Sequence, residues 1–155
     1  MEEKVKAEEK EQENSNLAVI RVRGLTGIKK DISKTLDQLR LYRRNYCIIL
    51  PNKKSNLGMV TKVKDYVTWG GIDDDTLNLL VEKKGQDYKG REQDSKNKIK
   101  YNRFLKIKDR NIKKFFRLNS PKKGYGRKGI KVTFSQGGAL GYRSDKIKDL
   151  IKRML

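Results

Sequence analysis

The sequence contains no histidine and only one cysteine, and its apolar runs are short. Without histidine, the chain lacks the side chain that most often carries acid–base catalysis. The lone Cys47 excludes a disulfide framework and a cysteine-rich metal site, and its apolar neighbours are typical of a small core residue. No apolar run approaches the ~20 residues that a helix needs to span a bilayer. We therefore expect a protein of the reducing cytoplasm that binds no cofactor, metal, membrane or small-molecule substrate.

Negative charge is also scarce in this sequence. The 155 residues include 39 Lys and Arg against 19 Asp and Glu, which leaves a net charge of +20. A surface of this charge repels itself unless a polyanion neutralises it. Nucleic acid is the most available polyanion in a cell, and its binding releases condensed counterions. The composition therefore favours a nucleic-acid partner.

The charge is distributed unevenly along the chain. Residues 1–16 hold six Glu and three Lys. We interpret them as a disordered tail or a frayed helix, because they cannot bury enough apolar surface to become ordered. Residues 84–131 hold 18 Lys and Arg against four Asp and Glu, with several glycines. We expect this basic segment to become ordered against RNA or a neighbouring protein, with a solvated loop as the alternative.

Apolar periodicity predicts a β-α-β-α-β core domain over residues 17–72. Pro51 should end its second strand and Gly70-Gly71 its third. Gly58, inside the second helix, indicates a close packing contact. The expected strands cover residues 17–23, 46–50 and 66–69, and the expected helices cover residues 30–42 and a stretch that follows a cap at Ser55 or Asn56.

Residues 73–155 are expected to form a basic extension with helices and RNA-facing loops. Apolar spacing and capping residues indicate its elements. These are a helix from Asp73 to Gly85, a short amphipathic helix around 107–115, an extended segment at 116–118, a strand at 130–134 and a last helix capped by Ser144.

The run Asp73-Asp74-Asp75 is the cluster of carboxylates that a nuclease metal would need. It lies at an expected helix N-terminus, where carboxylates cap free N–H groups and stabilise the helix dipole. We therefore favour capping over catalysis.

Gly137, Gly138 and Gly141 are not followed by the Lys-Ser/Thr pair of a phosphate-binding loop, so a tight turn is the better interpretation. Neither motif argues for an enzyme.

Three segments, taken in order, resemble one protein family. They are residues 18–24 (AVIRVRG), 39–46 (LRLYRRNY) and 58–70 (GMVTKVKDYVTWG). In this order and spacing they are similar to the universal large-subunit ribosomal protein L-thirty, in its long archaeal and eukaryotic form, which is numbered seven in eukaryotes. Residues 116–124 (FRLNSPKKG) and 137–143 (GGALGYR) resemble the C-terminal motifs of that form. The likeness covers residues 17–155, and the acidic tail departs from the long basic N-terminal extension of the eukaryotic form.

The resemblance implies an α+β fold: a three-stranded antiparallel sheet with two helices on one face, related to the ferredoxin-like fold, followed by the basic extension. It also implies a structural, non-catalytic constituent of the large ribosomal subunit in the cytoplasm. Such a protein would bind large-subunit ribosomal RNA near 5S ribosomal RNA and contact neighbouring ribosomal proteins.

Cations in the turns of the core and in the extension are the natural partners of RNA phosphates. Aromatic side chains can stack on unpaired bases, which we expect for Tyr125 and Tyr142; Tyr66 and Trp69 are weaker candidates, and a core position is favoured for Trp69. For any single cation, a solvated side chain is an equal alternative. The predicted RNA-binding residues are Arg21, Arg23, Lys29, Lys30, Arg43, Arg44, Lys53, Lys54, Lys62, Lys64, Lys122, Lys123, Tyr125, Arg127, Lys128, Tyr142 and Arg143.

Two other classes of protein share part of this pattern. A free basic nucleic-acid-binding regulator, or a chromatin-type protein, would have the same charge but would not need the three core segments in order. A nuclease would need Asp74 and its neighbours to bind a metal. We expect the ribosomal role because it accounts for both the charge and the segments.

Overall fold

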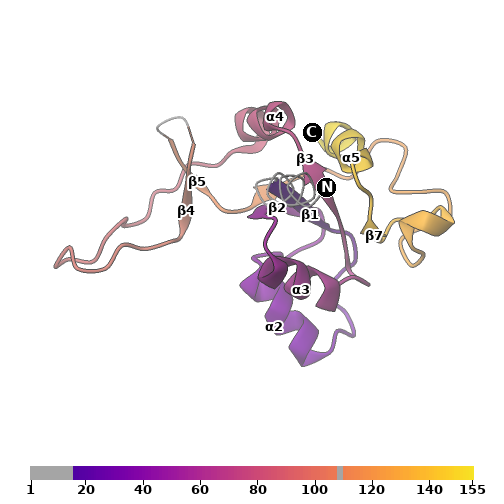
Figure 1. Ribbon diagram of the computed structural model, residues 1–155, viewed down its shortest axis with the longest axis horizontal. Helices are drawn as coiled ribbons and strands as arrows, with labels where there is room; N and C mark the ends of the chain where they lie inside the picture. Colours follow the sequence, from indigo (N-terminus) through magenta and orange to yellow (C-terminus); the bar gives the residue numbers. More distant parts are fainter. Residues whose placement is uncertain (1–15, 108–109) are drawn as a thin grey trace, which may run out of the picture.

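A mixed five-stranded sheet forms the centre of the computed structural model, which describes residues 16–107 and 110–155 (Figure 1). β1 (Asn16–Arg21) lies in the middle. It pairs antiparallel with β2 (Tyr46–Pro51) on one side and with β3 (Val67–Ile72) on the other. The expected α+β fold with a three-stranded antiparallel sheet is thus confirmed. The expected tail lies outside the described residues, except for Asn16.

The C-terminal half extends this sheet at both edges. β6 (Phe116–Arg117) pairs antiparallel with β2, and β7 (Gly141–Tyr142) pairs parallel with β3. The strand order is therefore β6-β2-β1-β3-β7. Segments from both halves of the chain contribute to one sheet.

Side chains alternate between the two faces of β1, and both faces are apolar. Val19 points to the face that α2 (Lys30–Gln38) and α3 (Lys54–Lys62) cover, where it packs with Leu36 and Val60. This arrangement confirms the two helices expected on one face. Each buried Leu or Val side chain contributes about 1.5–3 kcal/mol of transfer free energy.

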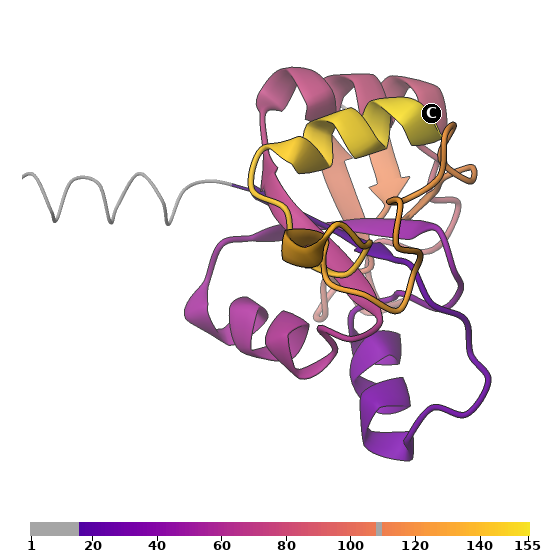
Figure 2. The same cartoon turned by 90° about the vertical axis from the view of Figure 1, so that its right-hand side faces the viewer.

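The opposite face of the sheet is covered by α4 (Asp74–Lys84) and α5 (Lys146–Met154). Ala18, Ile20 and Cys47 of the sheet form one buried cluster there with Leu80 of α4 and Ile147 of α5. Figures 1 and 2 show α4 and α5 side by side on this face, with α2 and α3 on the other. The C-terminal half therefore completes the hydrophobic core.

Residues 86–113, here called the arm, leave the core after α4 and return at β6; residues 108 and 109 are not described. The arm contains β4 (Phe104–Ile107) and β5 (Arg110–Lys113), which form an antiparallel pair. Figure 1 shows the arm projecting from the sheet. The helix expected around residues 107–115 is wrong. The backbone of this stretch pairs as strands instead, with Leu105 opposite Ile112 and Ile107 opposite Arg110.

Several expected boundaries in the first half also differ from the structure. Asn56 does not cap α3; its side chain donates to the Pro51 carbonyl at 2.8 Å, and Lys53 occupies the N-cap. Gly58 makes no close contact, because a Cβ there would have no atom within 4 Å. Gly70 does not end β3, which continues to Ile72. Glycine is required there by close packing: a Cβ would overlap the Ser144 carbonyl and lie 2.9 Å from Ile147 Cγ2.

Boundaries in the second half differ as well. Residues 130–134 do not form the expected strand; Thr133 makes one parallel bridge to Leu140, and a short 3-10 helix, η1 (Phe134–Gln136), follows. Ser144 has φ +50° and precedes the N-cap of α5, which is Asp145. The N-cap at Asp73 and the end of α4 at Gly85 are as expected.

Candidate nucleic-acid interface

Arg21, a predicted contact residue, lies inside the protein. It is 1% exposed. Its guanidinium donates to the carbonyl oxygens of Leu41 (2.6 Å), Arg23 (2.9 Å) and Gly24 (2.9 Å). Burial lowers the pKa of this guanidinium. Because its donors are satisfied by backbone oxygens, Arg21 fixes the turns around the end of β1 and is not available to RNA.

Arg143 is the second buried arginine of the predicted set, with 4% of its surface exposed. Its Nε donates to Thr68 Oγ1 at 2.9 Å, and its Nη2 donates to the Tyr125 and Ala139 carbonyls, both at 3.0 Å. Burial, together with the positive charge of Arg153, lowers its pKa to about 10. Arg143 therefore joins the loops of the C-terminal half to β3.

Tyr125 joins the basic loop after Pro121 to the turn before β2. Its hydroxyl donates to Asn45 Oδ1, and burial raises its pKa to about 12. On the other side of the loop, Arg153 of α5 donates to the Lys122 and Gly124 carbonyls at 3.2 and 2.9 Å. These bonds hold the backbone of the loop on the protein and leave its cations outside. The exposed cations of this loop are Lys122, Lys123, Arg127 and Lys128.

The loop lies at one end of the sheet, where β1 ends and β2 and β3 begin. Arg43 and Arg44 are exposed in the turn before β2 at this end, and Lys64 is exposed in the turn before β3. Arg23 lies beside Lys64: it is half-buried, donates to the Asp65 carbonyl at 3.2 Å and stacks over the Tyr66 ring at 5.0 Å. We call Arg23, Arg43, Arg44, Lys64 and the four loop cations the basic end.

The other predicted cations are also exposed and lie on other elements. Lys53 and Lys54 follow β2 at the opposite end of the sheet. Lys29 and Lys30 lie at the start of α2, and Lys62 lies in the last turn of α3. The structure therefore divides the predicted set into the basic end and smaller groups on the helices and at the opposite end of the sheet.

Tyr142 and Trp69 are neighbours on β7 and β3. They are paired in register, and their ring centroids lie 6.3 Å apart. Tyr142 is 60% exposed, whereas Trp69 is half-buried. Tyr142 therefore presents an aromatic surface to solvent, and its RNA contact stays a prediction.

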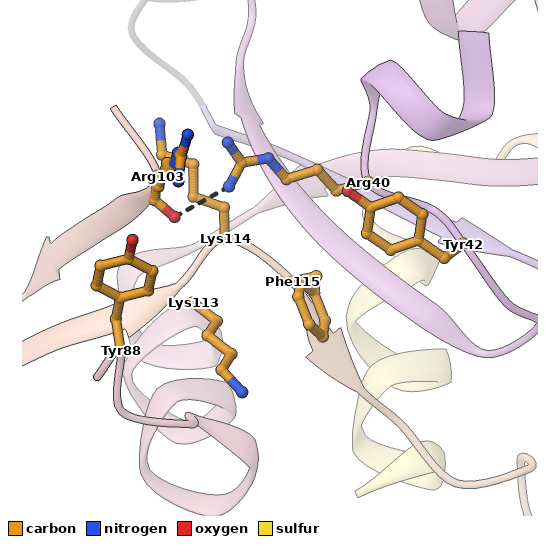
Figure 3. Close-up of a pocket in the computed structure, with 7 residues that line it drawn as sticks. All are labelled: Arg40, Tyr42, Tyr88, Arg103, Lys113, Lys114 and Phe115. Carbon is orange, nitrogen blue, oxygen red and sulfur yellow. Dashed lines mark hydrogen bonds between the residues drawn. The ribbon is translucent and has the colours of Figure 1, made fainter. Parts of the chain in front are cut away.

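A second basic site was missed in the sequence. Arg40, Arg103, Lys113 and Lys114 line a cavity of about 370 Å³ together with Tyr42, Tyr88 and Phe115 (Figure 3). The run Lys113-Lys114-Phe115-Phe116-Arg117 mixes cations with aromatic residues, which is a signal of nucleic-acid contact. It was obscured because residues 113–115 were expected in a helix and residues 116–118 in a separate extended segment.

The acidic run at the start of α4 is exposed, and its first residue links α4 to α5. Asp73 occupies the N-cap but makes no side-chain capping bond; its carboxylate pairs with Lys148 of α5 at 2.6 Å. That hydrogen bond raises the pKa of Lys148. Within the described ranges, no group of three or more His, Cys, Asp or Glu side chains is placed to hold a metal ion.

None of the helices in residues 16–107 and 110–155 is long and apolar enough to cross a membrane.

Comparison with known proteins gives consistent matches. The sequence model of the family described as "Ribosomal protein L30p/L7e" matches residues 17–67. A curated "Large ribosomal subunit protein uL30" from Methanococcus maripaludis is 47% identical in an alignment 152 residues long, which covers 89% of this chain and 98% of the relative. Proteins of the same name from Nanoarchaeum equitans and Methanopyrus kandleri are 45% and 37% identical and cover 89% and 86% of this chain. The match extends well beyond the core segment into the C-terminal half.

Proposed function

Because the chain belongs to the ribosomal protein L30p/L7e family, we propose that it binds large-subunit ribosomal RNA through its basic end and stabilises the RNA fold of the subunit. It is an archaeal-type ribosomal protein with a structural role, and its place is the ribosome in the cytoplasm. The finer parts of the proposal are the RNA contact itself, its position near 5S ribosomal RNA, and the absence of catalysis.

The observation that carries the proposal is the concentration of exposed cations at the basic end. Eight Lys and Arg side chains from three turns and one loop lie at the same end of the sheet. Two buried arginines hold the backbone of these turns in place. A cluster of cations on a fixed scaffold neutralises phosphates where RNA strands approach each other, with little need for base readout.

Neighbouring ribosomal proteins are the second class of partner in the proposal. The arm projects from the core and carries exposed cations along much of its length. Such an extension can reach RNA and protein surfaces that the core does not touch. We propose that the arm contributes to these contacts and that the basic end supplies most of the electrostatic binding.

Sedimentation of a cell extract in moderate and in high salt tests the proposal. In moderate salt the protein should travel with the large subunit, and high salt should release part of it because phosphate contacts are screened. A protein found only at the top of both gradients would contradict the ribosomal role. Equal affinity of the purified protein for duplex DNA and for ribosomal RNA would instead indicate a free nucleic-acid-binding regulator.

A further inference from the structure

The cavity at the base of the arm combines positive charge with aromatic surface. It has a volume of about 370 Å³, near the lower limit of small-ligand pockets, about 300–1,000 Å³. Among the described residues, its lining consists of four cations and three aromatic residues, with no carboxylate and no aliphatic side chain. Figure 3 shows Tyr88 and Phe115 on opposite sides of the space, with Arg40 and Lys114 extending along one side. This composition suits a ligand with an anionic group and a flat ring.

The positive charges around the cavity are not neutralised by the protein. Arg40 donates to the carbonyl oxygens of Arg103 (3.0 Å) and Asn102 (3.3 Å), and Lys114 donates to Asn102 Oδ1. Lys113 donates to Gln86 Oε1 at 3.4 Å. Each of these acceptors is neutral, and in the described part of the chain no ion pair involves the four cations. Burial and the charge of Arg40 lower the pKa of Lys114, so an incoming anion would relieve an existing repulsion.

The aromatic rings are held in place from behind. Phe115 stacks on Tyr46 with centroids 5.2 Å apart and rings 5° from parallel. Tyr88 stacks on Phe104 with centroids 5.5 Å apart. Each ring therefore has a rigid support, and Tyr42 of the cavity lining meets Phe115 at 87° with centroids 6.2 Å apart. Stacking of an unpaired base on such a ring raises affinity by about 5- to 150-fold.

The backbone at Arg40 provides an independent indication of function. Leu41 N–H bonds to the Leu36 carbonyl and Arg40 N–H to the Asp37 carbonyl, both at 2.9 Å, which is the pattern that closes a helix with a left-handed residue. Arg40 occupies that left-handed position with φ +60°, where glycine is usual. An arginine in this conformation is consistent with a requirement for its side chain, which reaches from α2 to the arm.

From these observations we infer that the cavity binds one unpaired nucleotide of RNA. Its base enters between Tyr88 and Phe115, and its phosphate faces Arg40 and Lys114. The site deepens the proposed function, on which it rests, by adding a specific contact to single-stranded RNA at the base of the arm. Because the core and the arm each supply part of the lining, binding also fixes the arm to the core.

The test uses the full chain and the pentaribonucleotide UU(2-aminopurine)UU, whose fluorescence falls when the 2-aminopurine ring stacks. The wild-type chain should quench the probe, and a fully paired duplex of the same sequence should give no quenching. Phe115→Leu should abolish quenching and lower affinity at least fivefold. Arg40→Gly removes the side chain but places the preferred residue at the left-handed position, so it should weaken binding without weakening the fold.

Phe134→Leu is the matched aromatic control, because Phe134 lies in η1, is partly buried and is outside the cavity lining. Circular dichroism establishes that each variant is folded. If Phe115→Leu and Arg40→Gly quench and bind the probe as the wild type does, the inference is overturned. Binding of a labelled Glu-Tyr peptide in the cavity in place of the probe would also overturn it, because the cavity would then recognise a protein.

Sedimentation separates this inference from the proposed function. Co-sedimentation of the wild type with large subunits, combined with no quenching of the probe, would overturn the cavity site and leave the ribosomal role intact. Cavity-dependent quenching by a protein that never sediments with the subunit would support the site and contradict the ribosomal role.

Discussion

The guanidinium of Arg143 donates through Nε to the buried hydroxyl oxygen of Thr68 at 2.9 Å. Thr68 in turn donates to the Gly141 carbonyl at 2.8 Å. Arg143 lies in the loop before α5 and Thr68 lies in β3. Their hydrogen bond therefore connects two segments that are 75 residues apart in the sequence. A residue that sequence analysis placed at the RNA surface is therefore part of the core.

Replacing Arg143 should cost stability. Arg143→Met leaves the Thr68 hydroxyl and the Tyr125 and Ala139 carbonyls without their donor. Removing a charged donor from several buried acceptors costs about 2–4 kcal/mol of unfolding free energy. Urea denaturation followed by circular dichroism measures this loss.

Arg127→Met is the matched control for that measurement, since Arg127 is exposed. It should change the unfolding free energy by less than about 0.5 kcal/mol but weaken RNA binding. Equal losses of stability in the two variants would contradict the structural role of Arg143.

Two glycines should respond in opposite directions to alanine. Gly70→Ala places a Cβ against the Ser144 carbonyl and Ile147, where α5 crosses β3, and should destabilise the protein by about 2–3 kcal/mol. Gly58→Ala places a Cβ in open space on the exposed side of α3 and should stabilise it by about 0.5–1 kcal/mol. Thermal unfolding of both variants beside the wild type checks the pair. A destabilising Gly58→Ala would indicate a contact that the described residues do not contain.

Cys47 should report on opening of the core. It is buried between the sheet and the C-terminal helices, and burial raises its pKa to about 12 from 9.0. At pH 8 this shift reduces the reactive thiolate by about 1,000-fold, so Ellman's reagent should label the native protein at least that much more slowly than the urea-unfolded chain. Because the sequence has one cysteine, all of the labelling by Ellman's reagent reports on Cys47.

The same measurement distinguishes the glycine variants. Gly70→Ala should speed labelling and Gly58→Ala should slow it, because each changes the population of the opened state. Rapid labelling of the native wild-type protein would show that the second face of the sheet is not closed as described.

The three core strands and the last helix were predictable because their apolar patterns are local. Ile20 and Val22 alternate with Arg21 and Arg23, and apolar residues recur at helical spacing from Ile147 onward. The arm was not predictable in the same way. Ile112 is buried because it belongs to the main core cluster with Phe116 and with residues of α4 and α5, and that cluster is assembled from distant segments.

For the candidate RNA-binding surface, the sequence predicted which kinds of residue take part better than it predicted where those residues lie. Charge alone could not distinguish Arg21 and Arg143 from exposed cations, since their acceptors are backbone carbonyls contributed by distant turns. The cavity around Arg40 was missed because it forms only when the arm returns to the core. The exposed side chains of the Lys122–Lys128 loop, by contrast, were predicted from a local basic, glycine-containing segment, and their RNA contact stays a prediction.

The basic end should contribute more to RNA affinity than cations elsewhere on the surface. Arg43→Gln/Arg44→Gln removes two charges from the basic end, and Lys53→Gln/Lys54→Gln removes two from the opposite end of the sheet. Each lost phosphate contact should reduce the slope of log affinity against log salt by roughly 0.7–0.9. We therefore expect the first variant to lose about 1.4–1.8 in slope and the second to lose little. Filter binding of ribosomal RNA over a salt series measures both slopes. The two variants have the same net charge, so equal losses would show that total charge, and not its position at the basic end, determines binding.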